Sequence, residues 1–284
     1  MPEPLKKIVS RYYGDACRIV EHRRMRAQSL FVVEAEMRGR KVRLLGTVGR
    51  SHEVMEHSAM DLAEPERLVF PYERMMLLAL ALAERRESVL LLGLGGGAML
   101  RHLEAYLPEA EITAVERDPA VIALAREHFR IRGRIVRADA EDWVAGRRAE
   151  FDAVLVDLYD STGGASVGEG FWDDCVAALR PGGCMGVNWA GGWTGADFDG
   201  TPLQRIARVM PRLPRSFLVA ERGPRGNFVQ LVPTEPDFRL PSLGARLAEF
   251  ARIYRLPRED RDILQRCAVS ARYPPRKQKA KRGA

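Results

Sequence analysis

The feature that most constrains this 284-residue chain is a regular alternation of strand and helix patterns that begins at residue 88. Short apolar runs, as in buried strands, alternate with helical segments. This alternation indicates a parallel sheet that helices cover on both faces. Two later runs, 216–221 and 227–232, are joined by a glycine–proline loop and predict an antiparallel hairpin at the sheet edge. We therefore predict an α/β fold with a mostly parallel seven-stranded sheet. The expected strands before the hairpin are 88–92, 111–115, 135–138, 151–156 and 184–189. The first expected helix follows the glycine-rich segment and ends near residue 107, and the other expected helices span 119–129, 141–147, 170–179 and 202–210.

The segments on either side of this alternation have other patterns. Residues 30–36 and 41–48 are rich in β-formers and predict a hairpin in a small N-terminal β unit, whereas 51–65 is expected to be irregular. An apolar stripe over 68–85 predicts a helix, and 242–268 predicts two helices separated at Pro257. We divide the chain into an N-terminal β-hairpin unit (1–65), a Rossmann-like α/β domain (66–240), C-terminal helices (241–271) and a basic disordered tail (272–284).

The charge is unevenly distributed. The first 50 residues carry +7 and residues 272–284 carry +6, which leaves −6 for 51–271 although the whole chain carries +7. An acidic centre does not predict nucleic-acid binding. No apolar run reaches the length of a membrane-spanning helix, and the first residues lack a secretion signal, so we expect a cytoplasmic protein without a membrane partner. The four widely spread cysteines predict neither a disulfide framework nor a metal site.

The positions of lysines and histidines exclude several enzyme classes. No lysine lies between residues 42 and 276, so the core cannot supply the lysine of a P-loop or of a Schiff base. All five histidines precede residue 129, which excludes a hydrolase whose histidine follows the nucleophile.

The strongest local motif is a glycine loop, Gly93-Leu94-Gly95-Gly96-Gly97-Ala98, between an expected strand and an expected helix. Such a loop lets the backbone approach a nucleotide or nucleoside at a helix N-terminus. Acidic residues follow the next strands, and ligands of open α/β sheets bind at these strand ends. A carboxylate there can accept bonds from a ribose, contact an adenine amine or attract a cationic ligand. The acidic residues concerned are Glu116, Asp139, Asp157 and Asp160.

These motifs together make the stretch 88–190 resemble the class I S-adenosylmethionine-dependent methyltransferase fold, and most of all its spermidine synthase (polyamine aminopropyltransferase) branch. The resemblance extends over about 30–232. The segments that carry it are LLGLGGG (91–97), AVERDP (114–119), FDAVLVD (151–157) with Asp160, LRPGG (179–183), FPYERM (70–75) and RGNF (225–228).

The resemblance implies an S-adenosylmethionine or decarboxylated S-adenosylmethionine co-substrate, no metal, an amine or polyamine acceptor, and a possible homodimer. The implied donor-binding residues are Gly93, Gly95, Gly97, Glu116, Asp139, Ala140 and Asp157. Asp157 and Asp160 are implied to hold and deprotonate the attacking amine, and Tyr72 to line the substrate site.

Three other functions remain open at this point. Gly96 stands where the resembling synthases usually have an aspartate that binds the donor amine, so methyl transfer and a non-catalytic nucleoside-binding homologue are both alternatives. The glycine loop also fits an NAD-dependent oxidoreductase, although no histidine or lysine follows it in the core to exchange a proton with a carbonyl.

Overall fold

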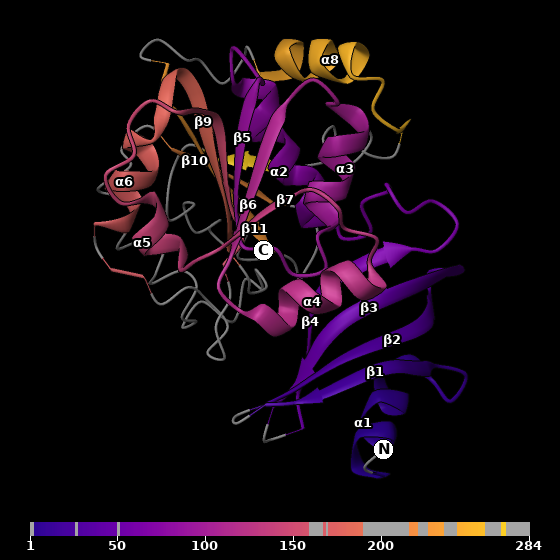
Figure 1. Ribbon diagram of the computed structural model, residues 1–284. Coiled ribbons are helices and arrows are strands. Elements are labelled where there is room, and N and C mark those ends of the chain that lie inside the picture. Colours follow the sequence, from indigo (N-terminus) through magenta and orange to yellow (C-terminus); the bar gives the residue numbers. More distant parts are fainter. Residues whose placement is uncertain are drawn as a thin grey trace, which may run out of the picture.

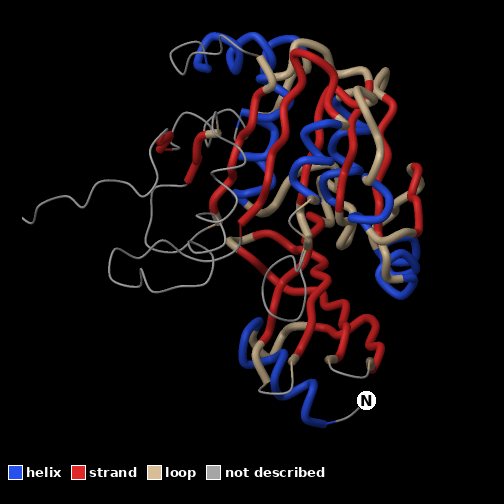
Figure 2. Tube along the Cα trace, turned by 90° about the vertical axis from the view of Figure 1, so that its left-hand side faces the viewer, coloured by secondary structure: helices blue, strands red, loops and turns tan. Residues whose placement is uncertain are grey.

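The computed structural model describes residues 3–25, 28–49, 52–158, 167–168, 170–189, 216–220, 227–235, 243–258 and 268–270. They form two sheets, a small antiparallel one and a large mixed one, which lie one above the other in Figure 1. In Figure 2 the first helix covers the outer side of the small sheet, next to the N-terminus.

The small sheet is larger than the predicted hairpin. Helix α1 (Glu3–Tyr13) precedes strands β1 (Arg18–Arg24), β2 (Ser29–Met37), β3 (Arg40–Val48) and β4 (Val54–Asp61). The β2–β3 hairpin is confirmed, with a turn at Arg38 and Gly39 that both have positive φ. The expectation of an irregular 51–65 segment is wrong, because β4 pairs with β3. β4 alternates weakly in hydrophobicity, since polar Glu56, His57 and Ser58 occupy its centre.

The expected α/β fold is confirmed by the large sheet. Its five parallel strands are β5 (Ser88–Leu92), β6 (Glu111–Glu116), β7 (Arg134–Arg137), β8 (Phe151–Val156) and β9 (Leu179–Trp189). The antiparallel β10 (Phe217–Ala220) and β11 (Phe228–Pro233) form the predicted hairpin. Among the described residues an eighth strand, β12 (Ala268–Ser270), extends the sheet to the order β12-β10-β11-β9-β8-β5-β6-β7. Strand β12 begins at Ala268, the last residue of the segment 242–268 that was expected to form two helices.

Helices cover both faces of the large sheet. They are α2 (Pro71–Leu82), α3 (Ala98–Tyr106), α4 (Pro119–His128), α5 (Ala140–Val144), α6 (Phe171–Ala177) and α8 (Leu243–Ile253). The Asp118 side chain accepts from the Ala120 amide and caps α4, as predicted from Asp-Pro. Strand β9 starts earlier than expected and passes through Pro181, Gly182 and Gly183 with a register shift instead of following them. The predicted helices at 202–210 and after Pro257 lie wholly or largely outside the described residues.

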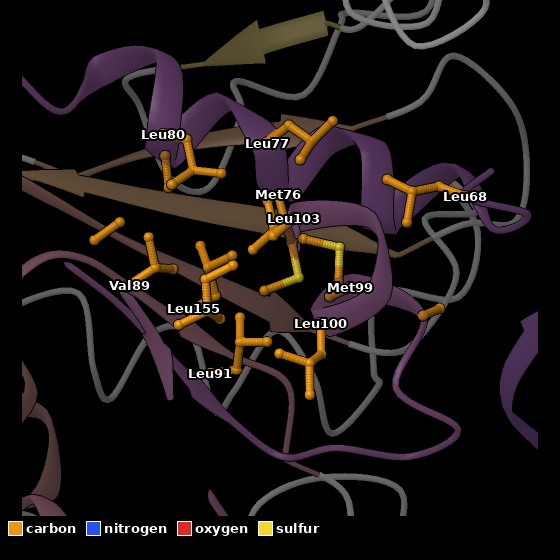
Figure 3. Packing of buried hydrophobic residues seen from close by; sticks show 14 of the residues in the cluster. Leu68, Met76, Leu77, Leu80, Val89, Leu91, Met99, Leu100, Leu103 and Leu155 are labelled. Carbon is orange, nitrogen blue, oxygen red and sulfur yellow. The ribbon is translucent and has the colours of Figure 1, made fainter. Parts of the chain in front are cut away.

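The hydrophobic core fills the space between α2, α3 and the sheet, as Figure 3 shows for Met76, Leu77, Leu103 and Leu155. A second cluster lies under α5 and α6 on the opposite face. Strand β2 is buried on both sides: Leu30 and Val32 join the main core, whereas Phe31 and Val33 pack under α1. The small sheet is thereby fixed against the large domain. None of the described helices is long and apolar enough to cross a bilayer.

Candidate functional site

The parallel strands bring the predicted polar residues to one edge of the large sheet. The glycine loop follows β5, Glu116 ends β6, Asp139 follows β7 and Asp157 follows β8. They line a cleft of about 480 Å³ whose opposite wall comes from the small sheet. That wall includes Leu45, Thr47, Met55 and His57 of β3 and β4. The cleft therefore lies between the two sheets, at the carboxyl ends of the parallel strands, where ligands of open α/β sheets bind.

The glycine loop is held in a conformation that requires glycine at its first position. Gly93 has a φ of +99°, and a Cβ added there would lie 2.2 Å from the carbonyl oxygen of Asp157. Its amide donates to the Val115 carbonyl oxygen at 2.9 Å. Gly95 also has positive φ and lines the cleft. The loop thus presents bare backbone to the cleft at the start of α3.

Glu116 and Asp139 also serve the local structure. The Glu116 carboxylate accepts from the Leu94 amide at 3.2 Å and from the Asp118 amide at 2.9 Å, so it connects the glycine loop to the start of α4. Burial raises the pKa of Glu116, and these backbone bonds oppose the shift. Asp139 caps α5 through the Glu141 amide. Both side chains still line the cleft.

Asp157 has two neutral hydrogen-bond donors. The Asn188 amide nitrogen donates to Oδ1 at 2.8 Å, and the Tyr72 hydroxyl donates to Oδ2 at 3.2 Å. Asn188 is positioned in turn by Asn227, whose amide donates to its Oδ1 at 3.0 Å. Burial raises the pKa of Asp157 to about 6, against the lowering effect of these donors. The carboxylate is consequently ionised at neutral pH and remains basic enough to accept a proton.

The structure brings most, but not all, of the predicted site residues together. Gly93, Gly95, Glu116, Asp139, Ala140 and Asp157 line the cleft. Gly97 does not: it is the N-cap of α3 and lies close to Ile131. Tyr72 lines a smaller adjoining cavity, together with Asp157. Asp160 lies outside the described residues.

Sequence reasoning missed Asn188 and the small-sheet wall. An asparagine within the apolar strand β9 is a signal that could have been used, because a buried amide needs partners. His57 gave no such signal, since β4 was not expected to be a strand. It is held by Thr47, whose Oγ1 lies 3.0 Å from the His57 Nε2, and burial lowers the pKa of His57 to about 4. The imidazole is therefore neutral at physiological pH.

The sequence of this chain is similar to a known family model and to curated proteins. The family model described as a methyltransferase domain matches residues 89–183. The polyamine aminopropyltransferase of Chromobacterium violaceum is 39% identical over 159 residues, which cover 54% of this chain and 60% of that protein. The polyamine aminopropyltransferase of Neisseria meningitidis serogroup B is 35% identical over 146 residues, which cover 49% and 54%. The matched region thus spans little more than half the length of these curated relatives.

A structural relative matches more of the chain. The crystal structure of a probable spermidine synthase from Corynebacterium glutamicum superposes with a TM-score of 0.63, at 22% identity, over 83% of this chain and 87% of that one. The resemblance found in the sequence is confirmed by these matches: the chain has a spermidine synthase-like fold, residues 89–183 match the methyltransferase-domain model, and the chain is similar in sequence to polyamine aminopropyltransferases.

Proposed function

We propose that this protein is a transferase that moves an aminopropyl group from decarboxylated S-adenosylmethionine to a small amine or polyamine. The observation that carries the proposal is Asp157, a carboxylate with raised pKa that lines the cleft next to the glycine loop and accepts hydrogen bonds from Tyr72 and Asn188. The names of the two curated relatives support aminopropyl transfer over the methyl-transfer alternative.

The cleft offers suitable partners for each part of an adenosyl sulfonium donor. In this proposal Gly93 and Gly95 leave room for the nucleoside's sulfur-bearing tail, and Glu116 accepts hydrogen bonds from the ribose. Asp139 and the adjacent Ala140 face the adenine. Gly97 supports the loop by letting α3 pack closely on Ile131. The proposal needs no metal, because a sulfonium is already an excellent leaving group.

The reaction requires an amine without its proton. A primary amine is a nucleophile only through its lone pair, so the acceptor must first give up a proton. The ionised Asp157 carboxylate accepts this proton and orients the nitrogen. The nitrogen then attacks the carbon next to the sulfonium, the carbon–sulfur bond breaks, and its electron pair leaves sulfur neutral in methylthioadenosine. Asp160 is proposed to be a second carboxylate that helps to hold and deprotonate the amine.

The test is a titration with both donors followed by turnover. Purified protein is titrated with decarboxylated S-adenosylmethionine and with S-adenosylmethionine, and each donor is then incubated with a panel of diamines and polyamines. We expect tighter binding of the decarboxylated donor and release of methylthioadenosine together with a lengthened amine, detected by mass spectrometry. Release of S-adenosylhomocysteine would show methyl transfer instead. Donor binding without any product over the whole panel would show a non-catalytic homologue.

The homodimer and the cytoplasmic location stay predictions. Strand β1 is one of the two edge strands of the small sheet, and no strand among the described residues pairs with its outer edge, which we propose as the place for pairing with a second copy. Sedimentation equilibrium of the purified chain would measure its oligomeric state directly.

A further inference from the structure

A small cavity adjoins the cleft and is not explained by the roles assigned so far. It has about 20 Å³ of space, enough for one water-sized group. It shares His57, Gly93, Leu94 and Asp157 with the cleft. Its remaining lining is mostly apolar, apart from the side chains of Ser58, Tyr72 and Glu73.

Glu73 is an unusual residue in such a cavity. It lies in the first turn of α2 and its side chain is buried, with the residue only 2% exposed. Its Oε2 accepts the Phe70 amide at 3.0 Å, which caps the helix. One hydrogen bond does not require a carboxylate, since a glutamine oxygen could accept it equally well. The acidic group therefore calls for a second explanation.

The glycine loop cannot supply an acid to this cavity. A Cβ added at Gly96 would lie 2.9 Å from the Ser58 Cβ and 3.0 Å from the Phe129 Cδ1, so no side chain fits between the loop and β4. Glu73 and Asp157 are consequently the two carboxylates that line the cavity among the described residues. The space between them is closed to bulky groups but suits a single ammonium.

We propose that Glu73 binds the terminal ammonium of the aminopropyl chain of the donor and thereby selects decarboxylated S-adenosylmethionine against S-adenosylmethionine. This inference rests on the proposed function. The methylene groups of the chain would contact the apolar lining, which includes Met76, Met99 and Leu155, and the ammonium would lie between Glu73 and Asp157. The carboxylate of S-adenosylmethionine would instead place a negative charge and extra volume next to two acids.

The charges around Glu73 predict a measurable proton release. Burial raises the pKa of Glu73 to about 8, and Asp157 raises it further, whereas Phe70, Arg101 and Arg74 oppose the shift. His57 is neutral and does not compete as a cation. At pH 7 the empty cavity therefore holds a protonated Glu73. Binding of an ammonium ion ionises the carboxyl group, so the proton leaves to solvent while the carboxylate pairs with the ammonium.

The experiment is calorimetric titration in two buffers of different ionisation enthalpy at pH 7. The wild-type protein is titrated with decarboxylated S-adenosylmethionine, with S-adenosylmethionine and with methylthioadenosine. We expect release of most of one proton only with the decarboxylated donor. S-adenosylmethionine controls for the sulfonium charge, and methylthioadenosine, which lacks both the sulfonium and the ammonium, controls for the adenosine.

The variant Glu73→Gln separates recognition from helix capping, because it keeps an oxygen for the Phe70 amide. We expect its thermal midpoint at pH 7 to be no lower than that of the wild-type protein. We also expect it to lose the proton release and to bind the decarboxylated donor at least about tenfold more weakly, as expected for a lost charged hydrogen bond. Its affinity for methylthioadenosine should not change. Glu104→Gln is the control, since Glu104 is an acid on the exposed side of α3 whose pKa is also raised by desolvation but which lines neither cavity.

Two results would overturn parts of this scheme separately. If Glu73→Gln retains the wild-type preference between the two donors and the wild-type proton release, the role of Glu73 is wrong while the proposed function stands. If the wild-type protein binds none of the three nucleosides, the proposed function is wrong and the role of Glu73 is wrong with it.

Discussion

Two aspartates at opposite ends of strand β8 have different surroundings although they are five residues apart. Asp152 accepts the amides of Glu87 and Ser88 at 2.8 and 3.0 Å and pairs with Arg180 at 3.2 Å. Among the described residues, the side-chain donors to the Asp157 carboxylate are the neutral groups of Asn188 and Tyr72, and Asp157 lines the cleft. A carboxylate whose lone pairs are satisfied by fixed donors holds a fold together. One with neutral donors and an open side can exchange a proton with a ligand.

The largest expected effect comes from exchanging each of these acids for its amide. Asp157→Asn should reduce transfer by about 10²–10⁴-fold, because the amide cannot accept the acceptor's proton. The fold should survive, since the variant still presents an oxygen to Asn188. The measurements are the steady-state rate and the thermal midpoint of Asp157→Asn and of Asp152→Asn.

Asp152→Asn is the matched control at the other end of the strand. It should keep its rate per folded molecule and lose about 2 kcal/mol of stability, because a buried charged hydrogen-bond network is broken. Full activity of Asp157→Asn would contradict the catalytic role of Asp157. Loss of activity in a stable Asp152→Asn would contradict the purely structural role of Asp152.

The next effect tests the close approach of Asp157 to the glycine loop. Gly93→Ala places a Cβ 2.2 Å from the Asp157 carbonyl oxygen at a φ of +99°, so strain and a steric clash act together. Gly146→Ala has a similar positive φ of +76° but nothing within 4 Å. We expect about 1 kcal/mol of destabilisation for Gly146→Ala, and clearly more for Gly93→Ala together with loss of nucleoside binding.

Chemical denaturation and nucleoside titration of both glycine variants provide the comparison. Equal destabilisation by the two substitutions would show that the loop can move away from Asp157, and the close approach would then not be essential.

A smaller effect concerns the pH dependence of the reaction. Asp157 must be ionised to accept a proton, so kcat/KM should rise as the pH increases through about 6, the pKa that burial produces. Asn188→Ala removes a donor that favours the charged form, so this acidic limb should move to higher pH. Profiles of the two proteins that coincide would exclude Asn188 as the residue that sets the basicity of Asp157.

A final effect, separate from the reaction, is on the stability of the ligand-free protein. Burial raises the pKa of Glu73 from 4.5 to about 8, so between these values the folded state holds a proton that the unfolded chain has lost. The stabilisation from protonated Glu73 is therefore complete below pH 4.5 and disappears as the pH rises through 8. Urea unfolding between pH 5 and 9 should show this decline in wild-type protein but a flatter profile in Glu73→Gln. Parallel profiles would mean that Glu73 is ionised in the folded state.

Much of the large sheet could be predicted from the sequence because its signals are local. Strand β5 has the predicted bounds, and Asp118 with Pro119 marks the start of α4. The small sheet was predicted only in part. Strand β4 has three polar residues in its centre, and it is a strand because β3 offers it a partner, which is a long-range effect. The start of β9 was missed for the same reason: pairing with β8 carries the strand through Pro181 and two glycines, residues that usually end one.

The sequence by itself determined the order of strands and helices from β5 to β9, the glycine loop and the acids at the strand ends, because these depend on residue type and spacing over a few positions. Only the tertiary structure decided which neighbours each acid has. Whether a carboxylate pairs with a guanidinium, as Asp152 does, or meets neutral donors beside a cavity, as Asp157 and Glu73 do, depends on segments distant in sequence. Desolvation and charge act through space, so the chemistry of these acids arises only when α2, β8 and β9 pack together.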